Sequence, residues 1–471
     1  MAHAHKAERP ANSQRQTLIP LALAQFICSF AGSNMNVMIN DMSRDLDTTV
    51  QGIQLAITTF LLVMAALMIP GGKLTDRYGR KWCFNLGLAL YGVGALLSAM
   101  APGLGVLIIG NSILEGVGTA LLIPPVYILA TLLFTDTTSR ARAFGAISAM
   151  GGLGAASGPL IGGAIATSIS WRAAFVFQAL VILLIVLLSR RNVQDPLPAD
   201  PSRSFDVGGA VLSSVGLVMV VLGIMAAQQN LWLMVALIVA GGGVLAWFLA
   251  SCRSKERSGR EPLLSTSLFR NRTSNLGLIT QNTQWLMLMG MSFVVAAYLQ
   301  VVRGYNAIET GVIFSAATVG LLASSIAAER LAKRYAQRML ISSGFVLTIL
   351  GVAVLLLLVA GRPNVWATSP GLLLIGLGVG VMLTPSVNVV QSSFPEDRQG
   401  EISGLSRSVS NLGSSMGTAI AGTILVAGIT ARPATSYALA LVVLALVGLV
   451  GLVAALKLPH ARAPQAASQP A

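Results

Sequence analysis

The chain has 471 residues, of which 54% are hydrophobic and only 10% are charged, and its formal net charge is +14. Soluble domains carry charges at roughly a quarter of their positions, so this composition excludes a soluble globular protein and favours membrane-spanning helices. The positive charge does not require nucleic-acid binding, because basic loops beside anionic lipid headgroups explain it.

Apolar runs of the length that a bilayer-spanning helix needs, about 20 residues, recur along almost the whole chain. The first run follows a basic tail but is too long for the core of a signal peptide, so we expect it to remain as the first helix. The sequence therefore predicts an all-α polytopic membrane protein with fourteen transmembrane helices. They are expected near residues 17–40, 51–71, 82–101, 104–131, 142–166, 172–189, 207–227, 231–251, 275–299, 310–329, 339–360, 367–390, 402–428 and 436–456.

The basic residues divide unevenly between the two sides of this arrangement. Five loops on one side hold a single arginine each, whereas the tails and the loops of the other side hold the remaining lysines and arginines, with none expected inside the hydrocarbon region. Cytoplasmic loops carry such an excess of positive charge. Both termini are therefore predicted to be cytoplasmic in a multi-pass protein of the cell membrane.

Two long loops divide the chain into related halves. The sequence GKLTDRYGRK (72–81) follows the second helix and ERLAKRYAQR (329–338) follows the tenth, so each half has a similar basic loop at the same place. This echo favours two repeated six-helix bundles with two inserted helices, although any two short basic loops look alike. The expected divisions are a cytoplasmic N-tail 1–16, an N-terminal bundle 17–189, a cytoplasmic linker 190–206, two inserted helices 207–251, a basic cytoplasmic loop 252–274, a C-terminal bundle 275–456 and a cytoplasmic C-tail 457–471.

Several motifs identify a family. GKLTDRYGRK resembles the G-x-L-A-D-R-x-G-R-K signature of the major facilitator superfamily, and GLGAASGPLIGG (152–163) resembles its antiporter motif on helix five. FDVGGAVLSSVGL, EPLLSTSLFRN and YLQVVRGYNAIETG resemble the fourteen-helix drug:proton antiporter family of that superfamily. The resemblance covers nearly the whole chain. It implies the major facilitator fold and export of drug-like compounds by alternating access.

The resemblance also implies residues that control the conformational change. In the first motif, charged side chains would latch the two bundles in one conformation, although simple anchoring of a basic loop is the alternative. On helix five, glycines four residues apart form a flat strip that admits a close neighbour, and a proline favours a bend; ordinary helix packing is the alternative. The candidates are Gly72, Asp76, Arg77, Gly79, Arg80, Lys81, Gly154, Gly158, Pro159, Gly162 and Gly163.

The sequence departs from the family where proton chemistry is expected. In helix one the family's aspartate position is Ala31, and its final proline position is Asn40. In helix four the family pattern R-x-x-Q-G becomes Ser112-Ile113-Leu114-Glu115-Gly116, so the arginine is lost and the glutamine is replaced by a carboxylic acid. Both familiar polar positions have therefore changed, and one new acidic residue has appeared.

Of the 17 acidic residues, Glu115 is the one expected deep inside a span. A charge at the bilayer centre costs about 2.5–3.5 kcal/mol on insertion scales, and without a basic partner the neutral form is favoured, so a proton could be exchanged near neutrality. Asn111, Ser112 and Thr119 share its helix face. We therefore predict that Glu115 faces a wet cavity and couples transport to protons. A permanently protonated side chain that joins two helices is the alternative.

Polar and aromatic residues on several helices predict a substrate cavity. Helix one in particular carries a polar stripe within about a quarter-turn, although single polar residues can equally join helices. A pocket of amide and aromatic groups suits amphipathic organic molecules. The candidates are Gln25, Phe26, Ser29, Phe30, Ser33, Asn36, Asn40, Gln54, Thr58, Asn111, Ser112, Thr119, Tyr127, Gln281, Gln284, Trp285, Phe293 and Asn388.

The sequence thus favours a secondary active transporter that exports small hydrophobic or amphipathic compounds in exchange for protons. Its histidines lie in the tails and its three cysteines lack metal or redox spacing, so we expect no cofactor or metal, with the proton gradient as energy source. The expected partners are the substrate, protons and the lipid bilayer, for a monomer that does not bind nucleic acid. Alternatives are a proton-independent facilitator, an anion or metabolite exporter, a lipid flippase and a sensor; an enzyme is disfavoured because no catalytic cluster is visible in the spans.

Overall fold

The computed structural model describes residues 11–134, 137–193, 195, 200, 204–227, 230–332, 334–359, 365–395, 398–428 and 433–459. The predicted N-tail, linker and C-tail therefore lie largely outside the described residues. The described part is helical, as expected from the apolar runs. Its elements are α1 (Ala11–Asn34), η1 (Met35–Met38), α2 (Ile39–Asp45), α3 (Val50–Tyr78), α4 (Arg80–Ala99), α5 (Leu104–Leu107), η2 (Ile108–Glu115), α6 (Gly116–Leu133), α7 (Thr137–Ser168), α8 (Trp171–Asn192), α9 (Val207–Ala226), α10 (Leu231–Arg257), η3 (Thr266–Arg270), α11 (Arg272–Ala297), η4 (Tyr298–Val302), α12 (Ala307–Leu331), α13 (Gln337–Val359), η5 (Val365–Thr368), α14 (Ser369–Gln391), α15 (Gln399–Gly428) and α16 (Pro433–Leu456).

Within the described residues, 13 helices are long and apolar enough to cross a membrane. The fourteenth predicted span corresponds to α15, which has 30 residues but contains many serines and an arginine. Its polar side chains face other helices rather than lipid: Ser408 and Ser415 donate hydrogen bonds to backbone carbonyls of α3, and Ser406 donates to Gln281 of α11. Helix α15 is therefore a polar span that is shielded inside the protein, and the predicted fourteen-helix fold is confirmed.

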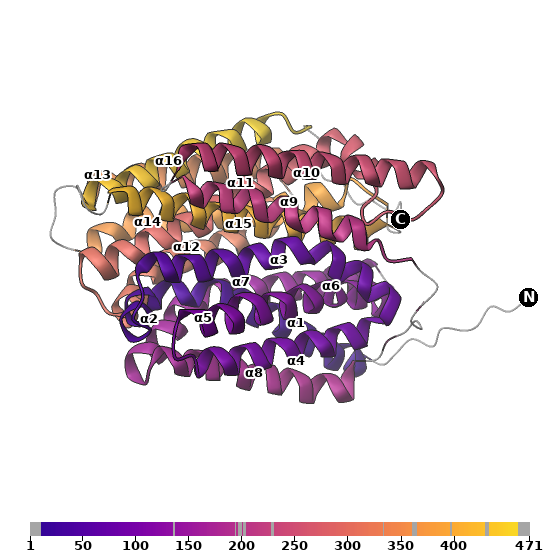
Figure 1. Cartoon of the computed structure of the whole chain (residues 1–471), viewed down its shortest axis with the longest axis horizontal. Helices are drawn as coiled ribbons and strands as arrows, with labels where there is room; N and C mark the ends of the chain where they lie inside the picture. Colours follow the sequence, from indigo (N-terminus) through magenta and orange to yellow (C-terminus); the bar gives the residue numbers. More distant parts are fainter. Residues whose placement is uncertain are drawn as a thin grey trace, which may run out of the picture.

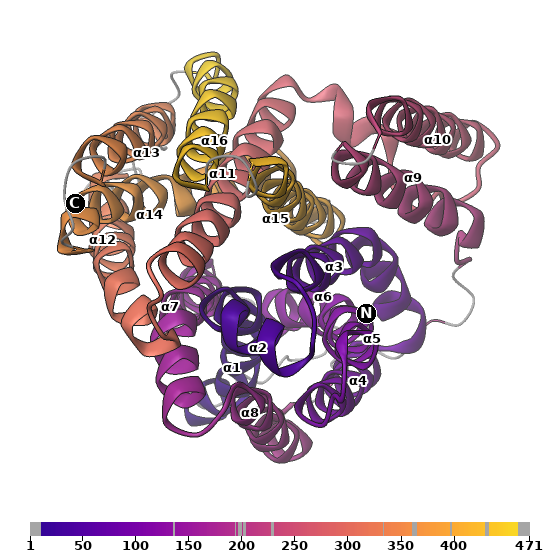
Figure 2. The same cartoon turned by 60° about the vertical axis from the view of Figure 1, so that its left-hand side comes forward.

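Two bundles face each other, α1–α8 below and α11–α16 above in Figure 1. The inserted helices α9 and α10 pack on each other and lie to one side, where α9 contacts both α3 and α15 (Figure 2). Ser214 of α9 donates a hydrogen bond to the carbonyl of Ala66 on α3, and Thr423 of α15 donates one to the carbonyl of Ile224 on α9. The inserted pair therefore contacts both bundles.

The two ends of the molecule differ in charge. We call the end where α3 leads into α4 the basic end, because the basic residues of positions 73–81 and 253–272 gather there; the opposite end is the far end. Helix α10 continues to Arg257, so the first basic residues of the predicted loop 252–274 are helical. Basic side chains in the last turn of a helix interact favourably with its dipole, which supports this extension.

The far end is closed where the bundles meet. Helix α1 is interrupted by η1, and Gln300 of the facing bundle bonds to the interrupted backbone: its Nε2 donates to the carbonyl of Asn36 at 2.8 Å, and its Oε1 accepts from the N–H of Asn40 at 3.0 Å. Nearby, Gly163 of α7 lies against the backbone of Ala307 at the start of α12. The close approach at Gly163 and the hydrogen bonds of Gln300 thus join the two bundles at this end.

Candidate functional site

A cavity of about 330 Å³ lies between the bundles toward the basic end. Helices α3 and α6 of one bundle and α15 of the other form most of its wall. Its lining mixes apolar side chains with charged ones. The lining residues are Met68, Ile69, Gly72, Lys73, Asp76, Arg80, Ile123, Pro124, Tyr127, Ile128, Thr131, Leu132, Leu263, Glu401, Ser403, Gly404 and Arg407.

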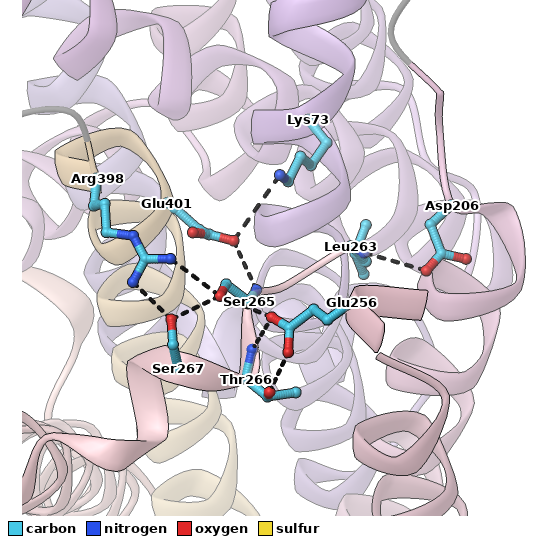
Figure 3. A network of polar contacts seen from close by, with 9 residues as sticks. All are labelled: Lys73, Asp206, Glu256, Leu263, Ser265, Thr266, Ser267, Arg398 and Glu401. Carbon is cyan, nitrogen blue, oxygen red and sulfur yellow. Dashed lines mark hydrogen bonds and ion pairs between the residues drawn. The ribbon is translucent and has the colours of Figure 1, made fainter. Parts of the chain in front are cut away.

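A polar network borders this cavity at the basic end, and Figure 3 shows it in close-up. Lys73 of α3 lies 3.9 Å from the carboxylate of Glu401 on α15, and Glu401 also accepts a 2.7 Å hydrogen bond from the N–H of Ser265. The loop that carries Ser265 inserts Leu263 into the cavity wall. The loop between the inserted helices and α11 therefore forms part of the cavity boundary.

A smaller central cavity of about 60 Å³ adjoins the first, because Met68, Ile123 and Arg407 line both. Its other walls combine neutral polar groups with aromatic and sulfur-containing side chains. The lining residues are Gln25, Cys28, Ser29, Gly32, Phe60, Leu61, Met64, Met68, Ile123, Ala155, Trp285, Met289, Arg407, Ser410, Asn411 and Ser414. A third cavity of about 60 Å³ lies nearer the far end and includes Ser33, Asn36, Pro159 and Ser292.

A chain of polar contacts crosses between the bundles at the junction of the first two cavities. The guanidinium of Arg407 donates to the hydroxyl of Tyr127 and lies 4.9 Å from the centre of its ring. That hydroxyl donates to Oε1 of Gln25 at 3.1 Å, and Nε2 of Gln25 donates to Ser29 at 3.1 Å. Side chains from α15, α6 and α1 are therefore joined beside the cavities.

Comparison with known proteins identifies this architecture. A family model, Major Facilitator Superfamily, matches residues 21–418. The chain belongs to the major facilitator superfamily. It is 30% identical over 413 residues to the puromycin resistance protein pur8 of Streptomyces alboniger, covering 86% of this chain and 81% of that protein. It is 27% identical over 425 residues to the multidrug resistance protein Stp of Mycobacterium tuberculosis, covering 89% and 77%.

A solved structure of a POT family transporter, in complex with a thioalcohol conjugated peptide, has a TM-score of 0.69 to this chain at 18% identity. The likeness covers 93% of this chain and 95% of the other, and it concerns the fold alone. Together these comparisons confirm the family that the motifs predicted. The protein is a multi-pass membrane transporter, and the cavities between its bundles are the place where a major facilitator binds its substrate.

Six of the predicted cavity residues line the three cavities. Tyr127 lines the first, Gln25, Ser29 and Trp285 line the second, and Ser33 and Asn36 line the third. Within α1, therefore, the polar stripe does face the space between the bundles. Helical periodicity was sufficient to predict that these side chains face the space between the bundles, and their role in binding substrate remains a prediction.

The other candidates do not line these three cavities, and many pack between helices. Phe26 stacks on Phe30, which contacts Phe177 of α8, and Phe293 is in the core. Gln54 donates to the carbonyl of Thr418 across the bundle interface. The remaining candidates are Asn40, whose N–H binds Gln300; Ser112, which donates to the carbonyl of Ala56; Gln281, which accepts from Ser406; the buried Thr58, Asn111, Thr119 and Gln284; and Asn388, which is exposed.

Glu115 is fully buried and does not line any of these three cavities. Its side chain lies against α4: a Cβ added at Gly94 would be 2.9 Å from Cγ of Glu115, and Tyr91 and Ser98 are its polar neighbours. The expectation of a wet cavity around this carboxyl is therefore not met in this conformation. Cys28, which lines the central cavity, lies beside Thr119, one helical turn from Glu115.

The helix around Glu115 has an unusual backbone that the sequence did not reveal. Residues Ile108–Glu115 form a π-helical segment, η2, and Glu115 is its last residue. Such segments are rare and often occur at functional sites. Glycines at positions 94 and 110 bring η2 and α4 into close contact here, so the carboxyl lies where two backbones pack tightly.

The first motif forms a compact turn at the basic end. Gly79 has φ +96°, which L-residues with a side chain rarely adopt, so a glycine is needed to connect α3 to α4. Arg80 pairs with Asp76 at 3.3 Å, and the N–H groups of Arg80 and Lys81 donate to the carboxylate of Asp195. These contacts lie within the N-terminal half and its linker. The contact between the bundles is made by Lys73, which the motif analysis did not single out; the predicted latch role of Asp76, Arg77, Arg80 and Lys81 remains a prediction.

The glycines of the second motif serve two different contacts. Gly154, Gly158 and Gly162 lie against α1, at Phe26, Ser33 and Asn34. Gly163 lies against Ala307 on the facing bundle, and Gly311 of α12 lies against the backbone of Pro159. Helix α7 therefore contacts α1 of its own bundle with one face and α12 of the other bundle with the adjacent face.

Two residues that sequence reasoning missed are central to this geometry. No basic residue was expected inside the hydrocarbon region, yet Arg407 lies in α15, about 12 Å from the start of the helix at 1.5 Å per residue. Its neighbours Ser406, Ser410 and Ser414 recur at four-residue spacing, a signal of a polar helix face that was available. Gln300 lay within a quoted family motif but was not identified as a contact between bundles.

Proposed function

We propose that this transporter exports small hydrophobic or amphipathic compounds in exchange for protons, by alternating access between its two bundles. The observation that carries the proposal is the set of cavities between the bundles, whose walls combine apolar, aromatic and amide groups. A contact between the bundles closes the far end beyond them. Such walls suit amphipathic organic molecules. The names of the two relatives, a puromycin resistance protein and a multidrug resistance protein, support export of drug-like compounds.

The basic end is proposed to face the cytoplasm, since cytoplasmic loops carry the excess of lysine and arginine. In this orientation the larger cavity lies toward the cytoplasm and the far end is closed. A compound would enter from the cytoplasm or the inner leaflet and leave after the far end opens. The contacts at the basic end and at the far end would then open in turn.

Glu115 is proposed as the proton-linked carboxyl. It is fully buried, one helical turn from Thr119, whose neighbour Cys28 lines the central cavity. Neither of its oxygens has a partner within ordinary hydrogen-bond geometry among the described residues. A carboxyl in that position would be neutral while sealed and could release its proton when the cavity wall parts. A proton moving inward gains about 2.3 kcal/mol per 100 mV of membrane potential, which favours the return step of the cycle.

The test uses purified protein in liposomes, with efflux of a lipophilic dye followed under an imposed pH gradient. For wild type we expect dye movement to follow the gradient. Glu115→Gln should abolish this response while dye exchange without a gradient continues, because a neutral amide keeps the packing but cannot release a proton. Glu309→Gln is the matched control, since Glu309 lies at the capped N-terminus of α12 and lines none of the three cavities.

Two results would overturn parts of the proposal. Gradient-driven transport that survives in Glu115→Gln would remove Glu115 from coupling. Wild-type transport that ignores the gradient would favour the proton-independent facilitator. The sealed position of Glu115 in this conformation is the observation on which that second candidate rests.

A further inference from the structure

Arg407 is a cation at the junction of the first cavity and the central cavity, in a helix that packs against the facing bundle. A guanidinium remains charged at any physiological pH and offers five N–H donors. Placing a charge in a poorly hydrated site is costly unless it is paired. The partners that Arg407 has therefore indicate what the cavity is built to bind.

Among the described residues that line the first cavity, the charged side chains other than Arg407 form ion pairs with one another. Arg80 pairs with Asp76, and Lys73 pairs with Glu401. No ion pair joins Arg407 to a carboxylate within the described residues. Its contacts there are neutral, the hydroxyl and ring of Tyr127. Arg407 is partly exposed to the first cavity. A cation over an aromatic face gains about 0.5–2 kcal/mol, much less than a charge-assisted pair with an anion could add.

The groups around Arg407 in the central cavity are neutral and in part aromatic. Gln25, Ser410 and Asn411 offer amides and hydroxyls, while Phe60 and Trp285 offer flat apolar surfaces. Cys28 is the titratable side chain that lines this cavity besides Arg407, and Glu115 lies behind it. The cavity therefore combines aromatic walls with one fixed positive charge.

We propose that Arg407 binds an anionic oxygen, a carboxylate or phenolate, on an otherwise apolar aromatic substrate, and so determines which compounds the transporter accepts. Carboxylates match the guanidinium fork through two parallel hydrogen bonds, and Tyr127 holds the guanidinium in place from one side. The aromatic walls take the apolar body of the compound. This inference rests on the proposed export function and gives it a substrate class.

The experiment compares two dyes with the same tricyclic frame and opposite charge, fluorescein and rhodamine 123. Binding to the full-length protein in lipid nanodiscs is measured by fluorescence anisotropy, and efflux of both dyes is measured in liposomes. Wild type should bind fluorescein more tightly than rhodamine 123. Arg407→Gln should weaken fluorescein binding by about tenfold or more, the usual size of a lost hydrogen bond to a charged group, and change rhodamine binding less than about threefold.

Two further variants control for folding and for general charge. Arg407→Lys keeps the charge without the fork, so it should retain part of the preference for fluorescein. Arg253→Gln removes an exposed arginine at the basic end and should change neither dye. Equal losses for both dyes in Arg407→Gln would show that the arginine is needed only for packing and would overturn the inference.

The outcomes separate this inference from the proposed function. If wild type binds fluorescein through Arg407 but moves neither dye, then export fails and the anion site remains. If wild type moves rhodamine 123 and Arg407→Gln binds fluorescein as wild type does, then export stands and the anion site is overturned. A loss confined to fluorescein, in binding and in efflux together, supports both.

Discussion

The two ends of the interface between the bundles are built differently. At the far end, glycines bring backbone against backbone, Gly163 on Ala307 and Gly311 on Pro159, and Gln300 bonds directly to the interrupted backbone after α1. At the basic end, within the described residues, side chains join the bundles across a cavity: Lys73 and Glu401, 34% and 19% exposed, form an ion pair at 3.9 Å, and Arg407 donates a hydrogen bond to Tyr127. Backbone contacts hold the far end, whereas flexible side chains hold the basic end.

This difference indicates that the basic end of the interface opens more easily than the far end. A backbone contact is lost only when a whole helix moves, whereas an exposed ion pair is worth about 0–1 kcal/mol and breaks easily. The conformation described here is therefore closed at the far end by shape and closed at the basic end only by side chains. Substitutions at the two ends should differ in the size of their effect.

The largest effect is expected for Gly163→Val. The added side chain would overlap the carbonyl of Ala307, so the closed far end should be destabilised by about 3 kcal/mol or more. A membrane-impermeant maleimide applied to cells should then label the native Cys28 of the central cavity much faster than in wild type. Gly152→Val is the matched control on the same helix, because a Cβ there meets no atom within 4 Å. Equal labelling in both variants would argue against a seal at Gly163.

A smaller shift in the same direction is expected for Gln300→Ala. Two hydrogen bonds across the bundles are lost, and a carbonyl and an N–H are left without their partner, at a cost of about 1–3 kcal/mol. The rate of Cys28 labelling should rise by about tenfold at 1.4 kcal/mol. Asn40→Ala is the control, because the backbone N–H that Gln300 accepts from is kept. If Asn40→Ala labels as fast as Gln300→Ala, the backbone bonds do not hold the far end.

At the basic end, Asp206 should matter for stability more than for the conformational change. It accepts hydrogen bonds from Lys255 at 2.5 Å and from the N–H groups of Gly209 and Leu263. Asp206→Asn should lower the free energy of unfolding by about 1–3 kcal/mol, seen as a lower Tm in detergent at pH 7. Asp47→Asn, at an exposed turn, is the control.

The contribution of Asp206 should also depend on pH. Burial raises the pKa of its carboxyl, but the hydrogen bonds from Lys255, Gly209 and Leu263 outweigh burial and lower the pKa below its ordinary value. The stabilisation is therefore complete above the unfolded pKa of about 3.9 and is lost as the pH falls through the lower folded pKa. The difference in Tm between wild type and Asp206→Asn should stay constant from pH 8 to pH 5 and shrink in more acid solution; a difference that grows in acid would contradict this assignment.

The smallest effect is expected for Lys73→Gln. It removes the ion pair with Glu401, whose carboxylate keeps its hydrogen bond from Ser265. An exposed pair of this kind contributes about 0–1 kcal/mol, so dye efflux and Cys28 labelling should change less than about fivefold. A change as large as that of Gly163→Val would mean that the contacts at the two ends contribute equally to keeping the bundles together.

The sequence predicted the family and the number of helices because both depend on patterns along one segment. Apolar runs and short motifs are local, and they located even the polar helix α15. The placement of side chains was harder, since periodicity shows which residues share a face but not which neighbouring helix that face meets. Asn111 and Glu115 share the predicted face, yet that face meets α4 rather than the cavity because glycines at 94 and 110 admit close packing there. Arg407 was missed because a charge near a span boundary was counted with the loop.

The position of α9 has a consequence for traffic between protein and lipid. Helix α9 packs beside the contact between α3 and α15 and is hydrogen-bonded to both helices (Figure 2). While α9 and α10 are docked, a compound dissolved in the hydrocarbon therefore has no direct path from the lipid to the contact between α3 and α15. The docked pair thus separates the lipid from the interface between the bundles on the flank that α9 occupies.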